Sequence, residues 1–288
     1  MANYRQFNSD ELSLKEKHQL LLASVAPRPI GFTASKSIDG YINLAPFSYH
    51  NAFSSNPPVV GISPAYSGRT GEPKNTLTNI LATKEFTLSV VTYDMVEQMN
   101  ICAAEYGSDV DEFKKSGLSR HPSKSISIPG VAESPLIMEC RFLQHIQFSS
   151  EPAGGNLLLG EIIYFHARDD IYNKAGQIDP KKVDQVSRMG LNWYSRANQG
   201  IFDLPAPKFL PIGVDTLPQV VKDSSYFTGK LLARLAYIES VPKHNVSIDC
   251  KERYANCNGD ELLKACANLL ENNQIEEAWQ VLHLGKII

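Results

Sequence analysis

The sequence lacks a long apolar run. A membrane-spanning helix needs about 20 consecutive apolar residues, and none of the hydrophobic stretches approaches that length. Residues 1–19 are polar, with no basic segment ahead of an apolar one, so they do not predict a secretory signal. We therefore expect a cytoplasmic protein with no membrane partner.

A dominant charge is also lacking. The chain carries 28 Lys and Arg residues against 31 Asp and Glu residues, which gives a formal net charge of -3. This balance argues against a broad electrostatic surface for nucleic acid, so we expect no nucleic-acid partner. A local group of basic residues can still hold a small phosphate.

Cysteine is scarce and irregularly spaced. Five cysteines occur in 288 residues: Cys102, Cys140, Cys250, Cys257 and Cys266. An odd number without tight pairing argues against a disulfide framework. Together with His244, the last three fit no standard zinc spacing, and no CxxC is present, so we expect no metal site.

The common catalytic signatures are absent. No GxGxxG follows a predicted strand, and GxxxxGK[ST], HExxH and GxSxG do not occur. No nucleophile stands beside a base in a recognisable pattern, and we interpret His50 and His145 as structural or surface histidines. We assign no catalytic side chain and expect a cofactor to carry any chemistry.

The first two thirds of the chain predict a mainly β unit with occasional helices. Ile30–Thr33 and Tyr41–Leu44 flank Asp39-Gly40, and the Asp-Gly pair is a strong hairpin signal. Leu136–Phe148 and Leu157–Ala167 are long strand candidates. Short strands with turns favour a barrel or a sandwich over a parallel α/β sheet.

Two helices and a strand are expected within this unit. Asn75–Thr83 has apolar residues at helical spacing, and Glu85–Thr92 alternates as a strand. Asp94, with Glu97 three residues later, has the form of a capping box and predicts the start of the second helix.

The character of the chain changes near residue 200. A proline-rich linker around residues 204–211 precedes a mainly helical part, with helices expected at Gly259–Leu270 and Ile275–Leu284. A single helix pair cannot bury its own apolar face, so we expect it to pack on the β unit or across a dimer. The predicted domains are therefore residues 1–200 and a C-terminal helical extension at 201–288.

Two segments carry chemistry that suits a ligand. Residues 43–55 interleave small hydroxyl and amide side chains with aromatic ones, a composition suited to the polar edge of a ring cofactor. Residues 67–76 place Arg69, Lys74 and Thr76 at a predicted helix start, where free N–H groups and the helix dipole favour phosphate. Read alone, each segment is also consistent with an ordinary polar loop.

The order of several short motifs resembles one family, the flavin-reductase-like, FMN-binding split barrels. The resemblance covers roughly residues 15–200, and its segments are Ala26–Gly31, Asp39-Gly40, Ala45–Tyr49, Asn51–Ser54, Asn56–Pro58, Lys74–Thr76 with Asn79-Ile80, Glu85–Val91, and Arg188–Gly190 with Tyr194. Asn75 replaces an aspartate that is frequent in the family. The resemblance implies a split β-barrel followed by a C-terminal helical extension, to which we assign no function.

The resemblance also implies where the FMN phosphate binds. Arg69, Lys74, Asn75 and Thr76 are assigned to the phosphate, and Ser63, at the end of the preceding strand, is a weaker candidate for the same group. Arg and Lys would add charge-assisted hydrogen bonds to the helix N-terminus.

The ring end of the cofactor is assigned to other residues. Ser48 and Asn51 are expected to bind the flavin ring edge or the ribityl chain, and Tyr194 to cover the ring or the nicotinamide pocket. For Arg28, two interpretations stay open: it faces the ribityl chain, or it is structural. By resemblance FMN sits at the interface of a homodimer.

The implied activity is that of an oxidoreductase, an NAD(P)H-dependent flavin reductase. NADH or NADPH would donate hydride to FMN, and oxygen, a partner monooxygenase or another acceptor would receive the electrons. Two alternatives from other classes remain. One is an FMN-binding electron carrier or flavin-storage protein without fast turnover, and the other is a split barrel that has lost its cofactor.

Overall fold

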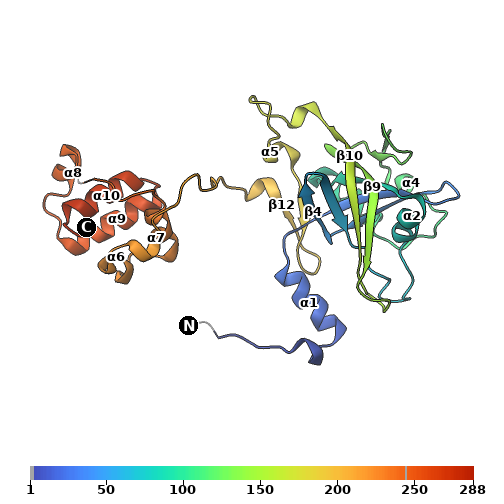
Figure 1. Cartoon of the computed structure of the whole chain (residues 1–288), viewed down its shortest axis with the longest axis horizontal. Helices are drawn as coiled ribbons and strands as arrows, with labels where there is room; N and C mark the ends of the chain where they lie inside the picture. The colour runs from blue at the N-terminus through green and yellow to red at the C-terminus, as the bar shows by residue number, and fades with distance from the viewer. Residues whose placement is uncertain (1–2, 244) are drawn as a thin grey trace. The chain divides into compact units, whose positions relative to one another are not determined.

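Figure 1 shows the computed structural model of the protein, which describes residues 3–243 and 245–288. The chain forms two compact units, the first ending at Phe202 and the second beginning at Asp203.

The first unit is built on antiparallel strands. Its main sheet has seven strands in the order β3-β2-β6-β9-β10-β5-β4, and smaller sheets pair β1-β11-β12 and β7-β8. The strands are β1 (Arg28–Pro29), β2 (Gly31–Lys36), β3 (Ile42–Phe47), β4 (His50–Ser55), β5 (Pro58–Ile62), β6 (Glu85–Val90), β7 (Arg120–His121), β8 (Gly130–Val131), β9 (Leu136–Gln147), β10 (Asn156–Ala167), β11 (Val186–Arg188) and β12 (Tyr194–Arg196).

Helices occupy the connections and the second unit. The first unit contains α1 (Leu14–Ser24), α2 (Asn75–Thr83), α3 (Val96–Ile101), α4 (Glu112–Ser116) and α5 (Pro180–Val183). The second unit contains α6 (Gln219–Asp223), α7 (Gly229–Ala236), α8 (Ile248–Arg253), α9 (Gly259–Glu271) and α10 (Ile275–Leu284).

The alternation of the strands explains the core of the first unit. Phe86 and Leu88 point from β6 into a cluster with Ile62 and Leu158, and all four side chains are fully buried. The predicted Asp-Gly turn joins β2 to β3, with Gly40 at a φ of 90°, a value that L side chains rarely adopt. These strands confirm the mainly β prediction.

The start of the second predicted helix was wrong. Residues Tyr93–Met95 form a 3-10 turn without a side-chain cap, and α3 begins only at Val96. Asp94 lies inside this turn, whose N-cap is Thr92, so its side chain is not at the cap position. The backbone N–H of Tyr93 bonds the carbonyl of Asp184, 3.1 Å away.

The second unit corrects the expectation for the C-terminal helix pair. The apolar faces of α9 and α10 are buried within the unit, in a cluster that includes Leu235 of α7, Cys250 of α8, Leu270 and Trp279. Trp279 also donates a hydrogen bond to the carbonyl of Leu235, at 3.2 Å. The expectation that the pair buries this face on the β unit or across a dimer is therefore wrong, because neighbouring helices already cover it (Figure 1).

Among the described residues there is neither a membrane-spanning helix nor a cluster of metal-binding side chains. No helix there is long and apolar enough to cross a membrane. No group of three or more His, Cys, Asp or Glu side chains in residues 3–243 and 245–288 could hold a metal ion. His244, considered above with the cysteines, lies outside the described residues.

Candidate functional site

Two adjoining cavities lie beside the end of β3 and the start of α2. One has a volume of about 240 Å³ and the other about 340 Å³. Pro46, Phe47, Ser67 and Lys74 line both. The backbone therefore places one lysine and one buried serine between two spaces of ligand size.

The N-terminus of α2 opens onto the smaller cavity. Lys74 is the N-cap residue, and its side chain makes no capping hydrogen bond in the part of the chain described. The next two residues, Asn75 and Thr76, line the cavity, and their backbone N–H groups precede the first hydrogen bond of the helix, which Leu77 donates to Lys74. These amides and the helix dipole make the end of α2 attractive to an anion.

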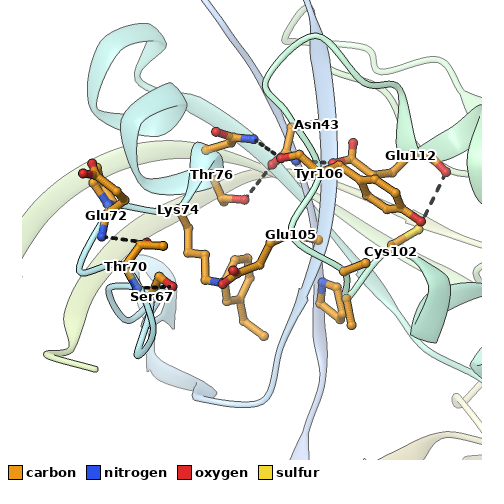
Figure 2. Close-up of a pocket in the computed structure, with 17 residues that line it drawn as sticks. Asn43, Ser67, Thr70, Glu72, Lys74, Thr76, Cys102, Glu105, Tyr106 and Glu112 are labelled. Carbon is orange, nitrogen blue, oxygen red and sulfur yellow. Dashed lines mark hydrogen bonds and ion pairs between the residues drawn. The ribbon is translucent and has the colours of Figure 1, made fainter. Parts of the chain in front are cut away.

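The ammonium group of Lys74 contacts the carboxylate of Glu105, as Figure 2 shows. Arg69 donates to the other oxygen of the same carboxylate at 3.2 Å. These hydrogen bonds, that from Lys74 first, hold the pKa of Glu105 at about 2. Arg69 and Lys74 therefore meet at one anion, although the Arg69 side chain is 79% exposed.

A buried polar network supports the inner wall of the same cavity. The Thr76 hydroxyl donates to the Asn43 side-chain oxygen at 2.7 Å, and the Asn43 amide donates to Glu112 at 2.8 Å. The backbone N–H of Leu44 also donates to Glu112, at 3.0 Å. Burial raises the pKa of Glu112. Because the Thr76 hydroxyl is engaged with Asn43, the backbone N–H is the donor that Thr76 presents at the helix start.

Arg28 is a buried cation at the wall of the larger cavity. Its guanidinium donates to the carbonyl oxygens of Leu22 at 2.8 Å, Val25 at 2.6 Å and Met189 at 2.8 Å. Its Nε donates to the Ser48 hydroxyl at 3.4 Å. Burial lowers the pKa of Arg28. These contacts show a structural role, because they tie the end of α1 and the segment after β11 to the barrel wall.

The structure brings together most of the residues predicted for the site. The residues that line one or both cavities are Arg28, Ser48, Ser63, Lys74, Asn75 and Thr76. Arg69 reaches this group through Glu105. The assigned contacts with FMN stay predictions.

Two predicted site residues, Asn51 and Tyr194, do not line either of the two adjoining cavities. Asn51 is exposed on β4, opposite Gly61 of β5, and its side-chain oxygen accepts from the N–H of Ala52 at 2.9 Å. Tyr194 lines a separate cavity of about 920 Å³, where the Arg188 guanidinium lies 4.6 Å from its ring centre. Arg188 also lines the larger of the two adjoining cavities, so it connects the two regions.

Sequence reasoning missed four residues of the site: Asn43, Ser67, Glu105 and Glu112. Asn43 and Ser67 lay inside the segments singled out above, where their residue types were a usable signal. Glu105 and Glu112 lie 31 and 69 residues along the chain from their partners Lys74 and Asn43. No local pattern indicates a pairing at that separation.

A family comparison identifies the first unit. The family model of the Flavin reductase like domain matches residues 23–197. The chain belongs to this family. A relative from Halalkalibacterium halodurans, an uncharacterized protein, is 35% identical over 207 residues, which are 70% of this chain and 96% of the relative.

Solved structures agree on the fold. Nitrilotriacetate monooxygenase component B from Bacillus cereus is 29% identical, with a TM-score of 0.66 over 71% of this chain and 100% of that one. A split-barrel-domain protein from Shewanella frigidimarina is 22% identical, with a TM-score of 0.60 over 70% and 100%. An FMN-binding protein from Thermus thermophilus, at 15% identity and a TM-score of 0.54 over 71% and 100%, shares the fold alone. These findings confirm the split-barrel fold of the flavin-reductase-like family, with C-terminal helices beyond the matched domain.

The residues present fit FMN in both charge and shape. A helix N-terminus with a neighbouring lysine and arginine suits a phosphate. Phe47 and Tyr49 supply aromatic surface in the larger cavity, and Ser48 and Ser63 supply hydroxyl groups there. A molecule with an anionic end and a flat, polar-edged ring matches this combination.

Proposed function

We propose that the protein is an FMN-dependent oxidoreductase, an NAD(P)H-dependent flavin reductase. The observation that carries the proposal is the position of Lys74, which caps α2 at the junction of the two cavities. A phosphate at this helix end leaves the rest of the cofactor beside Phe47, in the larger cavity.

The chain's own residues bind and orient the cofactor. Arg69, Lys74 and the first amides of α2 hold the phosphate, with Asn75 and Thr76 at the same end. Ser48 and Ser63 hydrogen-bond the ribityl chain or the ring edge. The buried Arg28 fixes the wall behind Ser48. When bound, FMN accepts hydride and passes the electrons on, so no side chain has to act as acid or base.

Arg188 would lie between FMN and the nicotinamide that donates hydride. It lines the larger cavity of the proposed FMN site and also the neighbouring cavity that contains Tyr194. A nicotinamide donor in that neighbouring cavity would lie next to the ring end of FMN. Positioning and exclusion of water are then the contributions of the protein.

We also propose a homodimer formed through the outer face of β4, β5, β9 and β10. Phe53 is 55% exposed there, and it lies over Gly61, where an added Cβ would come within 2.5 Å of the Phe53 ring. Ile146 and Leu157 are paired across β9 and β10 and extend the apolar surface. Asn51 is on the same face, opposite Gly61, so a second copy would bring its own flavin site towards Asn51.

The dimer has a direct test. Light scattering after size exclusion should give twice the chain mass of 31.9 kDa, and Phe53→Asp should shift it to the single-chain mass. An unchanged dimer in the variant would place the interface on another face.

The absorption spectrum tests the enzyme function. The purified protein, mixed with FMN, is titrated with NADH and in parallel with NADPH in the absence of oxygen. Loss of the yellow colour would support the reductase and identify the donor. Colour that persists would favour an electron carrier or a flavin store. Failure to bind FMN would overturn the proposal. The electron acceptor we propose is a partner monooxygenase or oxygen.

A further inference from the structure

Glu105 lies among the groups that we assign to the FMN phosphate. Its carboxylate contacts Lys74 with one oxygen and Arg69 with the other, the second contact at 3.2 Å. The buried side chain of Ser67 also lies near enough to help lower the pKa of Glu105. An anion that belongs to the chain therefore uses the donors that a phosphate requires.

We propose that Glu105 competes with the FMN phosphate for Lys74 and Arg69, and so keeps FMN exchangeable. This inference rests on the proposed function of the site. In this arrangement FMN enters and leaves as a substrate, and the carboxylate of Glu105 returns to the cations when it leaves. A site with the same cations and a neutral residue at position 105 would hold FMN more tightly.

The charges explain why the two anions compete. A phosphate monoester carries between one and two negative charges near neutral pH and needs several charge-assisted hydrogen bonds. If Glu105 stays in place, two anions lie side by side around the same cations, and they repel each other. If Glu105 moves away, its two contacts are lost. Either arrangement weakens phosphate binding and leaves a flavin without phosphate unaffected.

The position of Glu105 suits a group that can move. Its side chain is 42% exposed. It lies after α3, in a segment without helix or strand between Ala103 and Tyr106, so displacement breaks no regular structure. Solvation of the released carboxylate moderates the cost, and therefore the competition adjusts the affinity without blocking the site.

Glu112 shows the contrast within the same cavity. Its carboxylate is buried and is held by Asn43 and by the backbone N–H of Leu44. Both contacts belong to the buried polar network that supports the cavity wall, and neither involves Lys74 or Arg69. Of these two carboxylates, Glu105 is the one in reach of the cations.

The test is the isosteric variant Glu105→Gln in the full chain, which removes the charge and keeps the shape. Dissociation constants for FMN and riboflavin are measured by quenching of flavin fluorescence. We expect FMN to bind about tenfold more tightly than to the unaltered protein, through slower release, and riboflavin to be unchanged. Glu72→Gln is the matched control, since Glu72 lines the same cavity but forms no ion pair with any described residue.

Each result decides the question. Tighter FMN binding with unchanged riboflavin binding supports the competition. Unchanged or weaker FMN binding in Glu105→Gln overturns it, and weaker binding means that Glu105 instead orders the two cations. An equal gain in Glu72→Gln also overturns it, because general charge then explains the effect. If the unaltered protein and both variants bind neither flavin, the proposed function itself fails.

Discussion

The two units bury polar groups to very different extents. Fourteen polar or charged side chains are buried among the described residues up to Phe202: Arg28, Thr33, Ser35, Asn43, Ser67, Thr76, Asn79, Thr87, Ser89, Glu112, Ser116, Ser134, Glu139 and Asn156. In residues 203–243 and 245–288 the corresponding group is His283 alone, which contacts the carbonyl of Pro242 at 2.8 Å. The second unit instead has a core cluster of eighteen apolar residues.

The core of the second unit consists almost entirely of apolar side chains, whereas the first unit also buries polar side chains around a cavity. An apolar core is stabilised by burial alone, whereas each buried polar group needs a partner to offset its desolvation. Several polar groups of the first unit converge on one cavity through Asn43, Thr76 and Glu112. Substitutions in the second unit should therefore change stability, whereas substitutions in the first unit should change flavin binding.

Leu270→Ala should destabilise the second unit by roughly 3 kcal/mol and leave FMN affinity unchanged, because the fully buried leucine belongs to a core that contains no residue assigned to the flavin. Trp279, which is 1% exposed, reports on this unit by its fluorescence. Trp193 is replaced by Phe in all samples so that a single tryptophan emits. Denaturant titration should then show a lower midpoint.

Leu210→Ala is the matched control for this experiment, because Leu210 is 89% exposed. Its midpoint should stay close to that of the parent protein. If Leu270→Ala instead lowers FMN affinity as well, the second unit contributes to the site, and the division between packing and function does not hold.

Lys74→Ala should weaken FMN binding by roughly 2 kcal/mol, or about 30-fold, and change riboflavin binding little. The reason is that the lysine lies where we place the phosphate, which riboflavin lacks. Flavin fluorescence gives both affinities. Equal losses for the two flavins would contradict the phosphate assignment.

Lys84→Ala provides a cation control on the same helix. Lys84 follows α2 at its C-terminal end and packs over the ring of Phe142, at 4.7 Å. Its removal should leave the ratio of FMN to riboflavin affinity unchanged. A shift in that ratio would mean that overall charge, and not the position of Lys74, determines the affinity for FMN.

Much of the fold could be predicted because its signals are local. The predicted helix Asn75–Thr83 has the bounds of α2, and the two long strand candidates correspond to β9 and β10. Helix α1 was missed although Ser13 and Glu16 form a capping box, a signal that is present in the sequence. The pattern at Asp94 and Glu97 did not distinguish the 3-10 turn at Tyr93–Met95 from the start of an α-helix.

The site was predictable where one segment carries it. Lys74, Asn75 and Thr76 are adjacent in sequence and stand at a helix start, so their residue types and spacing already indicate a phosphate. Glu105 and Glu112 lie far from that segment in the sequence, and only the folded structure brings them to the same cavity. Likewise, the pattern did not decide between two roles for Arg28; its three carbonyl partners in the structure give it a structural role, and its contact with the ribityl chain stays a prediction.

Acid should lower the stability of the first unit more than that of the second, by a smaller amount than the substitutions above. Burial lowers the pKa of both His50 and His121 from 6.5, so in this range the unfolded chain binds protons more readily than the folded one. Their contribution to stability is therefore fully present above pH 6.5 and is lost as the pH falls from 6.5 through the lower pKa values of the folded state. Groups of the second unit with shifted pKa values, such as Cys250 and Tyr226, start from 9.0 or above and have raised values, so they do not titrate in this range.

Calorimetry between neutral pH and about pH 5 should thus show a falling midpoint for the first unit and a smaller change for the second. The variant His50→Asn keeps a donor for the carbonyl of Gly61, which His50 contacts at 2.9 Å, but does not titrate. It should reduce the pH dependence of the first unit. If its slope equals that of the parent protein, burial of His50 is not a source of the acid sensitivity, and His121, beside His166 and Glu139, remains as the group to replace next.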